Sequence, residues 1–140
     1  MKNVLIVWAD IHETGIPIID EQHRGIVSTI NSLFYFMRKQ RGQDVMAPTL
    51  LMLEQYTKVH FLTEETLLEA AGYPGLETHR QLHRGLIDTM FRISLLSKRS
   101  GDPDELLAFL KDWWLQHING NDRAYAPFLV DALHAMGDDL

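Results

Sequence analysis

The sequence contains no cysteine among its 140 residues, and this absence excludes several kinds of site. Disulfides, iron–sulfur clusters and cysteine-bound zinc all require thiol side chains. A metal ion bound by this chain must therefore be held by His, Asp and Glu side chains.

Positive charge is also scarce, because 13 Lys and Arg residues face 19 Asp and Glu residues, for a formal net charge of -6. No basic run is present, so neither a nucleic acid nor an anionic membrane surface is expected as a partner. The apolar run near the N-terminus ends at Asp10 and is too short for a signal peptide or a membrane span. These features predict a cytoplasmic protein, and the length and composition favour a single domain over residues 1–140.

Strand-like alternation of polar and apolar residues is absent, whereas apolar residues recur at helical spacing in four segments. Residues 1–19 are expected to form an irregular arm, anchored by Trp8. Asp20 is the expected N-cap of the first helix, and Pro48 is expected in the opening turn of the second. The four helices are expected at about residues 20–40, 44–71, 76–98 and 103–136. Short turns between them predict an all-α, up-down-up-down four-helix bundle with an N-terminal arm.

Two pairs of ionisable residues lie four positions apart within apolar stripes. They are His60 with Glu64 and His79 with His83. On an α-helix this spacing places both side chains on one face, about 6 Å apart. Taken alone, the first pair is also typical of a helix-stabilising interaction, and the second is also found on surfaces. Burial without a partner would cost several kcal/mol, however, so a shared metal ion is the simplest explanation.

The alternating topology predicts that seven ionisable side chains converge at one level of the bundle. His117 and Asp122 are five residues apart, which is about 140° around a regular helix. A π-bulge or local unwinding at residues 119–121 is therefore expected to turn Asp122 inward. Five imidazoles and two carboxylates suffice for two metal ions that share both carboxylates and an oxo or hydroxo group, with one position left open for a small neutral ligand. The seven side chains are those of His23, His60, Glu64, His79, His83, His117 and Asp122.

In order and spacing, these seven residues resemble the ligands of the hemerythrin family, and within it the bacterial single-domain members. Trp8, the run from Asp20 to His23, and Tyr125 extend the resemblance, which spans about Trp8 to Leu129. It implies two non-haem irons that bind dioxygen reversibly. By this resemblance, the first iron is held by His79, His83 and His117, the second by His23 and His60, and both by the bridging Glu64, Asp122 and oxo or hydroxo group.

The oxygen pocket that the resemblance implies is walled by Phe61, Trp113 and Ile118. Trp114 occupies a position where the family commonly has Leu. If its side chain points inward it narrows the pocket, and if it points outward it only packs on the surface. His12, His134, Glu65 and Glu69 are expected to lie outside the site, with the two glutamates in solvent.

Four functions are compatible with this ligand set. The first is reversible dioxygen binding for storage, delivery or sensing, and the second is a di-iron oxidase or peroxidase. The third is an oxygen-sensing module that acts through a partner protein, and the fourth is a structural zinc bundle. The set is rich in histidine, whereas oxygen-activating bundles are typically rich in carboxylates, so the first function is favoured and an enzyme is not expected.

Overall fold

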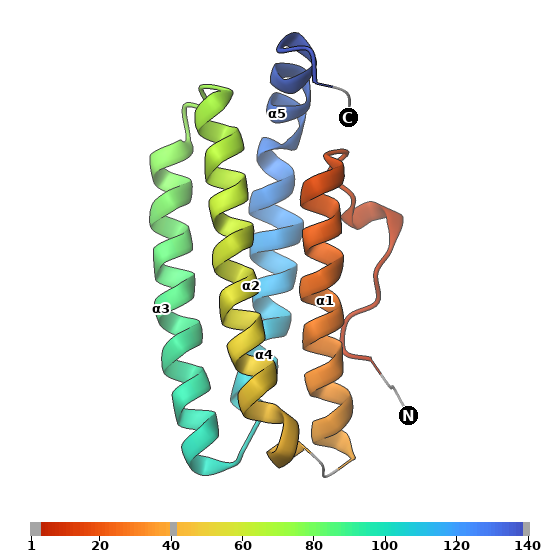
Figure 1. The fold of residues 1–140 in the computed structure, drawn as a ribbon, viewed down its shortest axis with the longest axis vertical. Helices are drawn as coiled ribbons and strands as arrows, with labels where there is room; N and C mark the ends of the chain where they lie inside the picture. The colour runs from red at the N-terminus through yellow and green to blue at the C-terminus, as the bar shows by residue number, and fades with distance from the viewer. Residues whose placement is uncertain (1–3, 40–41, 139–140) are drawn as a thin grey trace.

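The computed structural model describes residues 4–39 and 42–138, and these form a bundle of four helical rods (Figure 1). The first three rods are α1 (Pro17–Arg38), α2 (Gly42–Ala70) and α3 (Leu76–Ser100). The fourth is continuous through α4 (Asp104–Trp113), the π-helix η2 (Trp114–Asp122) and α5 (Arg123–Ala135). Successive rods run in opposite directions, and the described residues contain no strand. The predicted all-α, up-down-up-down bundle is confirmed.

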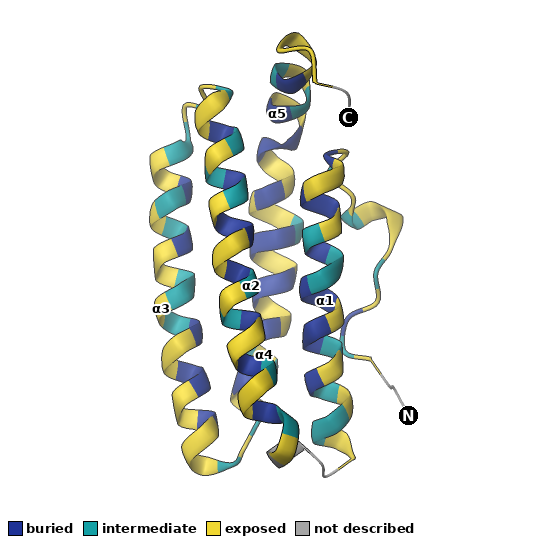
Figure 2. Ribbon diagram, in the orientation of Figure 1, coloured by how far each residue is buried: buried dark blue, intermediate teal, exposed yellow. Residues whose placement is uncertain are grey.

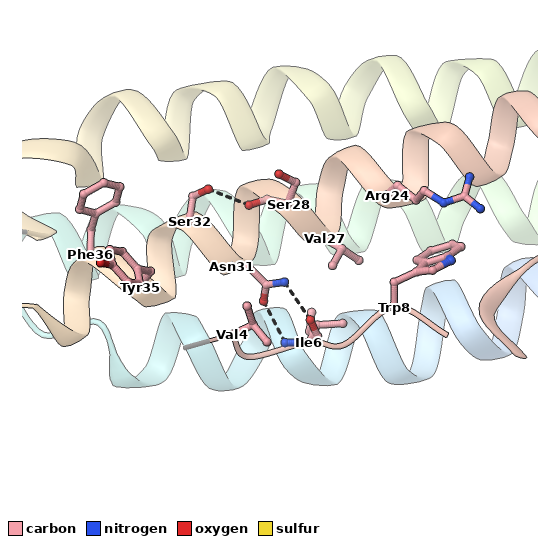
Figure 3. Close-up of a pocket in the computed structure, with 10 residues that line it drawn as sticks. All are labelled: Val4, Ile6, Trp8, Arg24, Val27, Ser28, Asn31, Ser32, Tyr35 and Phe36. Carbon is pink, nitrogen blue, oxygen red and sulfur yellow. Dashed lines mark hydrogen bonds between the residues drawn. The ribbon is translucent and has the colours of Figure 1, made fainter. Parts of the chain in front are cut away.

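The N-terminal arm lies along the outer side of α1 and includes a short 3-10 helix, η1 (Asp10–His12). Asn31 of α1 holds its extended part, because the Asn31 Oδ1 accepts hydrogen bonds from the backbone N–H groups of Leu5 and Ile6, both at 2.9 Å. The Arg24 guanidinium lies 4.8 Å from the ring centre of Trp8. Figure 3 shows Ile6, Trp8, Arg24 and Asn31 around the groove between the arm and α1. The arm is thus fixed at two points, one of them the expected anchor Trp8.

Two helix starts differ from the sequence-based expectation. Helix α1 begins at Pro17, whose fixed φ suits the first helical position, so Asp20 is not the N-cap. Instead, the Asp20 carboxylate accepts hydrogen bonds from the backbone N–H groups of Thr14 (2.8 Å) and Gly15 (3.2 Å), and so closes the turn before the helix. Helix α2 begins at Gly42, which places Pro48 inside the helix rather than in its opening turn.

Buried residues recur along every rod of the bundle (Figure 2). The buried apolar side chains form two clusters. The larger cluster includes Ile26 of α1 and Phe61 of α2, and the smaller includes Ile19 of α1 and Leu68 of α2. Along these helices, the expected ligands His23 of α1 and Glu64 of α2 lie between the two clusters, and His60 lies next to Phe61. No helix in the described part of the chain is long and apolar enough to cross a membrane.

Candidate metal centre

All seven expected ligands are buried, and they meet inside the bundle although they come from four different rods. Their exposed fractions run from 0% to 7%, the largest being that of His79. Ionisable side chains are rarely buried to this extent unless they are paired or hold a metal. The ligands are His23 from α1, His60 and Glu64 from α2, His79 and His83 from α3, and His117 and Asp122 from η2.

The ligand atoms form two groups that share both carboxylates. Within each group, one atom from every residue lies within 4.8 Å of the others. One group contains three histidines and the other contains two, and Glu64 and Asp122 belong to both. The groups are Glu64, His79, His83, His117 and Asp122, and His23, His60, Glu64 and Asp122.

Glu64 lies between the two sets of histidines, with one oxygen toward each set. Its Oε1 lies 2.5 Å from the Nε2 of His60 and 3.8 Å from that of His23. Its Oε2 lies 2.9 Å from the Nε2 of His79 and 3.3 Å from that of His83. This is the orientation that a carboxylate bridging two metal ions requires.

The two carboxylate oxygens of Asp122 also face different sets of histidines. Its Oδ2 lies 3.1 Å from the Nε2 of His23 and 3.6 Å from that of His60. Its Oδ1 lies 3.2 Å from the Nε2 of His117 and 3.4 Å from that of His79. Each of the two carboxylates therefore has one oxygen on the side of each set of imidazoles.

The π-helix η2 brings Asp122 to this position. In a π-helix the backbone hydrogen bonds run between residues five apart, so His117 and Asp122 fall on neighbouring faces instead of about 140° apart. The predicted irregularity is confirmed, but it spans nine residues, Trp114–Asp122, rather than three. Asn119 and Gly120, both weak helix formers, lie within it.

Several buried polar atoms at the centre of the cluster form no hydrogen bond. They include the Nε2 atoms of His83 and His117 and the Oδ1 of Asp122. The Nε2 atoms of His23 and His60 lie only 3.1 Å apart, so a proton or a cation must separate their lone pairs. Nitrogen and oxygen atoms that lack hydrogen-bond partners and converge in this way fit a metal site, where they would be the ligand atoms.

The same crowding changes the pKa values of the metal-free side chains. Burial lowers the pKa of His60 and His79, but Glu64 and Asp122 outweigh this and raise both to about 9. Burial raises the pKa of Glu64, but the neighbouring histidines, above all His60, hold it well below its usual value. Burial dominates at His117 and lowers its pKa to about 4. The metal-free cluster thus holds protons where metal ions would otherwise supply positive charge.

Two side chains outside the seven contact the outer nitrogens of the histidines. Gln22 Oε1 lies 2.9 Å from the Nδ1 of His60, and Glu65 Oε2 lies 3.2 Å from the Nδ1 of His83. The expectation that Glu65 lies in solvent is therefore wrong, because α2 packs against α3 and turns this half-buried residue toward His83. The Nδ1 atoms of His23 and His117 have no hydrogen-bond partner.

Aromatic and apolar side chains surround the ligands. Phe61 stacks on the ring of His83 with 3.7 Å between centroids, and Trp113 meets Phe61 edge-on at 6.2 Å. Ile118 and Trp114 are each 1% exposed, so Trp114 points inward. The four residues expected as pocket walls are all buried, and none adds a charge to the site.

The fold and this cluster define a helical-bundle protein whose centre can hold two metal ions. Residues 14–129 match the family model described as the hemerythrin HHE cation binding domain. The chain belongs to the hemerythrin family.

Relatives and a solved structure agree with this assignment. The chain is 35% identical over 123 residues to the bacteriohemerythrin of Stenotrophomonas maltophilia (strain R551-3), covering 87% of this chain and 80% of the relative. It is 36% identical over 137 residues to the bacteriohemerythrin of Pseudomonas aeruginosa (strain LESB58), covering 95% of this chain and 85% of the relative. A crystal structure of a hemerythrin mutant superposes with a TM-score of 0.78 at 25% identity, covering 90% of this chain and 98% of the other.

Proposed function

We propose that this protein binds dioxygen reversibly at a di-iron centre. The observation that carries the proposal is the division of the two carboxylates, each with one oxygen toward the two-histidine set and one toward the three-histidine set. The family assignment supports it, because the matching model is a cation-binding domain and the relatives are bacteriohemerythrins.

In this proposal, the three-histidine set holds one iron and the two-histidine set holds the other. Imidazole and carboxylate donors suit iron, and the absence of cysteine leaves only such donors. Glu64 and Asp122, which belong to both groups, would be shared by the two ions. When bound, the irons supply the electrons that dioxygen takes up on binding and returns on release. The first ion is held by His79, His83 and His117, and the second by His23 and His60.

In this proposal the open position lies on the side of His23 and His60, because that group contains one histidine fewer. There the ring of Trp114 lies 6.1 Å from that of His23, and the ring of Phe61, which stacks on His83, lies 5.9 Å from that of His60. These buried side chains would keep water, and the protons that water carries, away from a small ligand at this position. In this proposal, the chain's contribution to reversibility is the buried, apolar surrounding of the open position.

The composition of the ligand set favours binding over oxygen activation. Five imidazoles face two carboxylates, whereas the di-iron bundles built on Glu-x-x-His motifs use a carboxylate-rich set. Neutral imidazoles stabilise highly oxidised iron less than anionic carboxylates do. A di-iron oxidase or peroxidase, the alternative function, is accordingly disfavoured.

Iron analysis combined with an oxygenation cycle tests the proposal. Purified protein loaded with iron should contain two irons per chain. After anaerobic reduction, a visible absorption should appear in air, disappear under argon, and return over several cycles. Complete irreversible oxidation in the first cycle would favour an enzyme, and stoichiometric zinc without a visible spectrum would favour a structural site; either result would refute the proposal.

A further inference from the structure

The outer nitrogens of the two sets of histidines have unlike partners. His83, in the three-histidine set, faces a carboxylate, while His60, in the two-histidine set, faces a neutral amide. A ligand histidine is oriented, and its basicity is set, by the group that accepts the hydrogen bond from its other nitrogen. The two proposed metal positions therefore differ in charge as well as in histidine count.

Glu65 is held against His83 from two directions. Its Oε2 lies 3.2 Å from the His83 Nδ1, and its Oε1 lies 3.4 Å from the Nε of Arg80, one turn earlier on α3. Stacking of Phe61 on His83, at 3.7 Å and 2° between ring planes, fixes the imidazole that Glu65 contacts. With Nδ1–H donating to Glu65, the His83 Nε2 is free to point into the cluster, where it has no hydrogen-bond partner.

Gln22 is the neutral counterpart at His60. Its Oε1 lies 2.9 Å from the His60 Nδ1, and its Nε2 donates to the Thr63 Oγ1 at 3.0 Å. The Thr63 hydroxyl in turn donates to the backbone carbonyl of Val59 at 2.9 Å. This chain of hydrogen bonds fixes which end of the Gln22 amide faces His60, so the group orients the imidazole without adding charge.

We propose that Glu65 is a positioning residue that acts through His83 to lower the reduction potential of the iron in the three-histidine set. A hydrogen-bonded carboxylate makes the imidazole a stronger donor, and its negative charge favours the more positive metal. Gln22 provides no such charge, so the iron at the open position keeps the higher potential. This inference rests on the proposed function for the identity of the metal.

Glu65→Gln, which retains the shape of the side chain and removes its charge, is the main test variant. Its reduction potential, measured under argon on iron-loaded protein, should rise, and its affinity for Co²⁺ should fall by about tenfold to a hundredfold. A tenfold change in the ratio of affinities for oxidised and reduced iron corresponds to about 59 mV for a one-electron couple. Glu69→Gln is the matched control, because Glu69 also pairs with Arg80 (3.2 Å) but is not among the residues that contact a ligand histidine.

Gln22→Glu is the reciprocal variant, since it places a carboxylate on His60. It should lower the potential, and the double variant Glu65→Gln with Gln22→Glu should lie between the two single variants. If Glu65→Gln does not fold, the Gln22→Glu result alone decides. An unchanged potential and Co²⁺ affinity in Glu65→Gln, or an unchanged potential in Gln22→Glu, would overturn the inference.

These measurements are made without oxygen, so they separate this inference from the proposed function. Wild-type protein that binds two irons but fails the oxygenation cycle, together with a raised potential in Glu65→Gln, would refute the proposed function alone. Wild-type protein that passes the cycle, together with an unchanged potential in Glu65→Gln, would refute the role of Glu65 alone.

Discussion

The indole of Trp114 meets the imidazole of His23 edge-on, with 6.1 Å between ring centroids and 86° between ring planes. The other aromatic rings in contact with this indole lie in the N-terminal arm, where the ring centroids of Trp8 and His12 are 5.7 Å and 5.2 Å away. One buried ring thus connects the arm to the two-histidine side of the metal centre.

Trp114→Leu should speed the entry of dioxygen. The smaller side chain leaves space beside His23, so the association rate measured by stopped-flow absorption should rise several-fold, while the loss of packing costs about 2 kcal/mol of unfolding free energy. Leu115→Ala, at a half-exposed neighbouring position, is the control. An association rate unchanged in folded, iron-loaded Trp114→Leu would show that this ring does not restrict the pocket.

Trp8→Ala should shorten the lifetime of the oxygenated protein. The substitution removes the indole that lies between the Arg24 guanidinium and the Trp114 ring, so water reaches the Trp114 ring more easily. Water near the metal centre promotes irreversible oxidation. The rate of autoxidation, followed by absorption in air, should rise several-fold at unchanged iron content. Ile11→Ala alters an exposed residue of the same arm and should leave the rate at the wild-type value.

Loss of a ligand should have different effects on the two sides of the centre. His23→Ala removes a ligand from only one group, so about one iron per chain should remain. Asp122→Ala removes a ligand from both groups, so binding of both irons should weaken. His134→Ala changes an exposed histidine and should retain two irons. Equal iron loss in His23→Ala and Asp122→Ala, measured by metal analysis, would contradict two separate ion positions.

The metal-free protein should be most stable near pH 6.5. The pKa values of His60 and His79, about 9 in the folded protein, exceed the ordinary value of 6.5, so their stabilisation is present below pH 6.5 and is lost as the pH rises to about 9. The pKa of His117, about 4, lies below 6.5, so its contribution is lost as the pH falls from 6.5 to about 4. The melting temperature of metal-free protein, measured by circular dichroism from pH 4 to 9, should pass through a maximum.

Above pH 6.5 the affinity for metal should rise with pH, whereas the stability of the metal-free protein should fall. Ligation requires deprotonated imidazoles, so the affinity for Co²⁺ should rise between pH 6.5 and 9, by up to about tenfold per pH unit for each proton released. His60→Gln lacks one of the imidazoles that release a proton, so its Co²⁺ affinity should rise less steeply with pH. A Co²⁺ affinity independent of pH over this range would show that His60 and His79 are not ligands.

Helical periodicity was enough to predict the bundle and the convergence of the seven side chains. The pairs four residues apart each share one helix face, and short turns leave few alternatives to an alternating topology. The role of Glu65 was not predictable in this way, because its contact depends on how α3 is rotated against α2. Trp113 and Trp114 are about 100° apart on a regular helix, and the burial of Trp114 was not predictable because it depends on the N-terminal arm, which places Trp8 and His12 against this indole.

An iron-edge anomalous map from a crystal of the iron-loaded protein tests the central claim most directly. Two peaks are expected inside the bundle, one beside His23 and His60 and the other beside the three remaining histidines, with Glu64 and Asp122 between them. A single peak, or an Asp122 side chain turned away from both peaks, would contradict the claim.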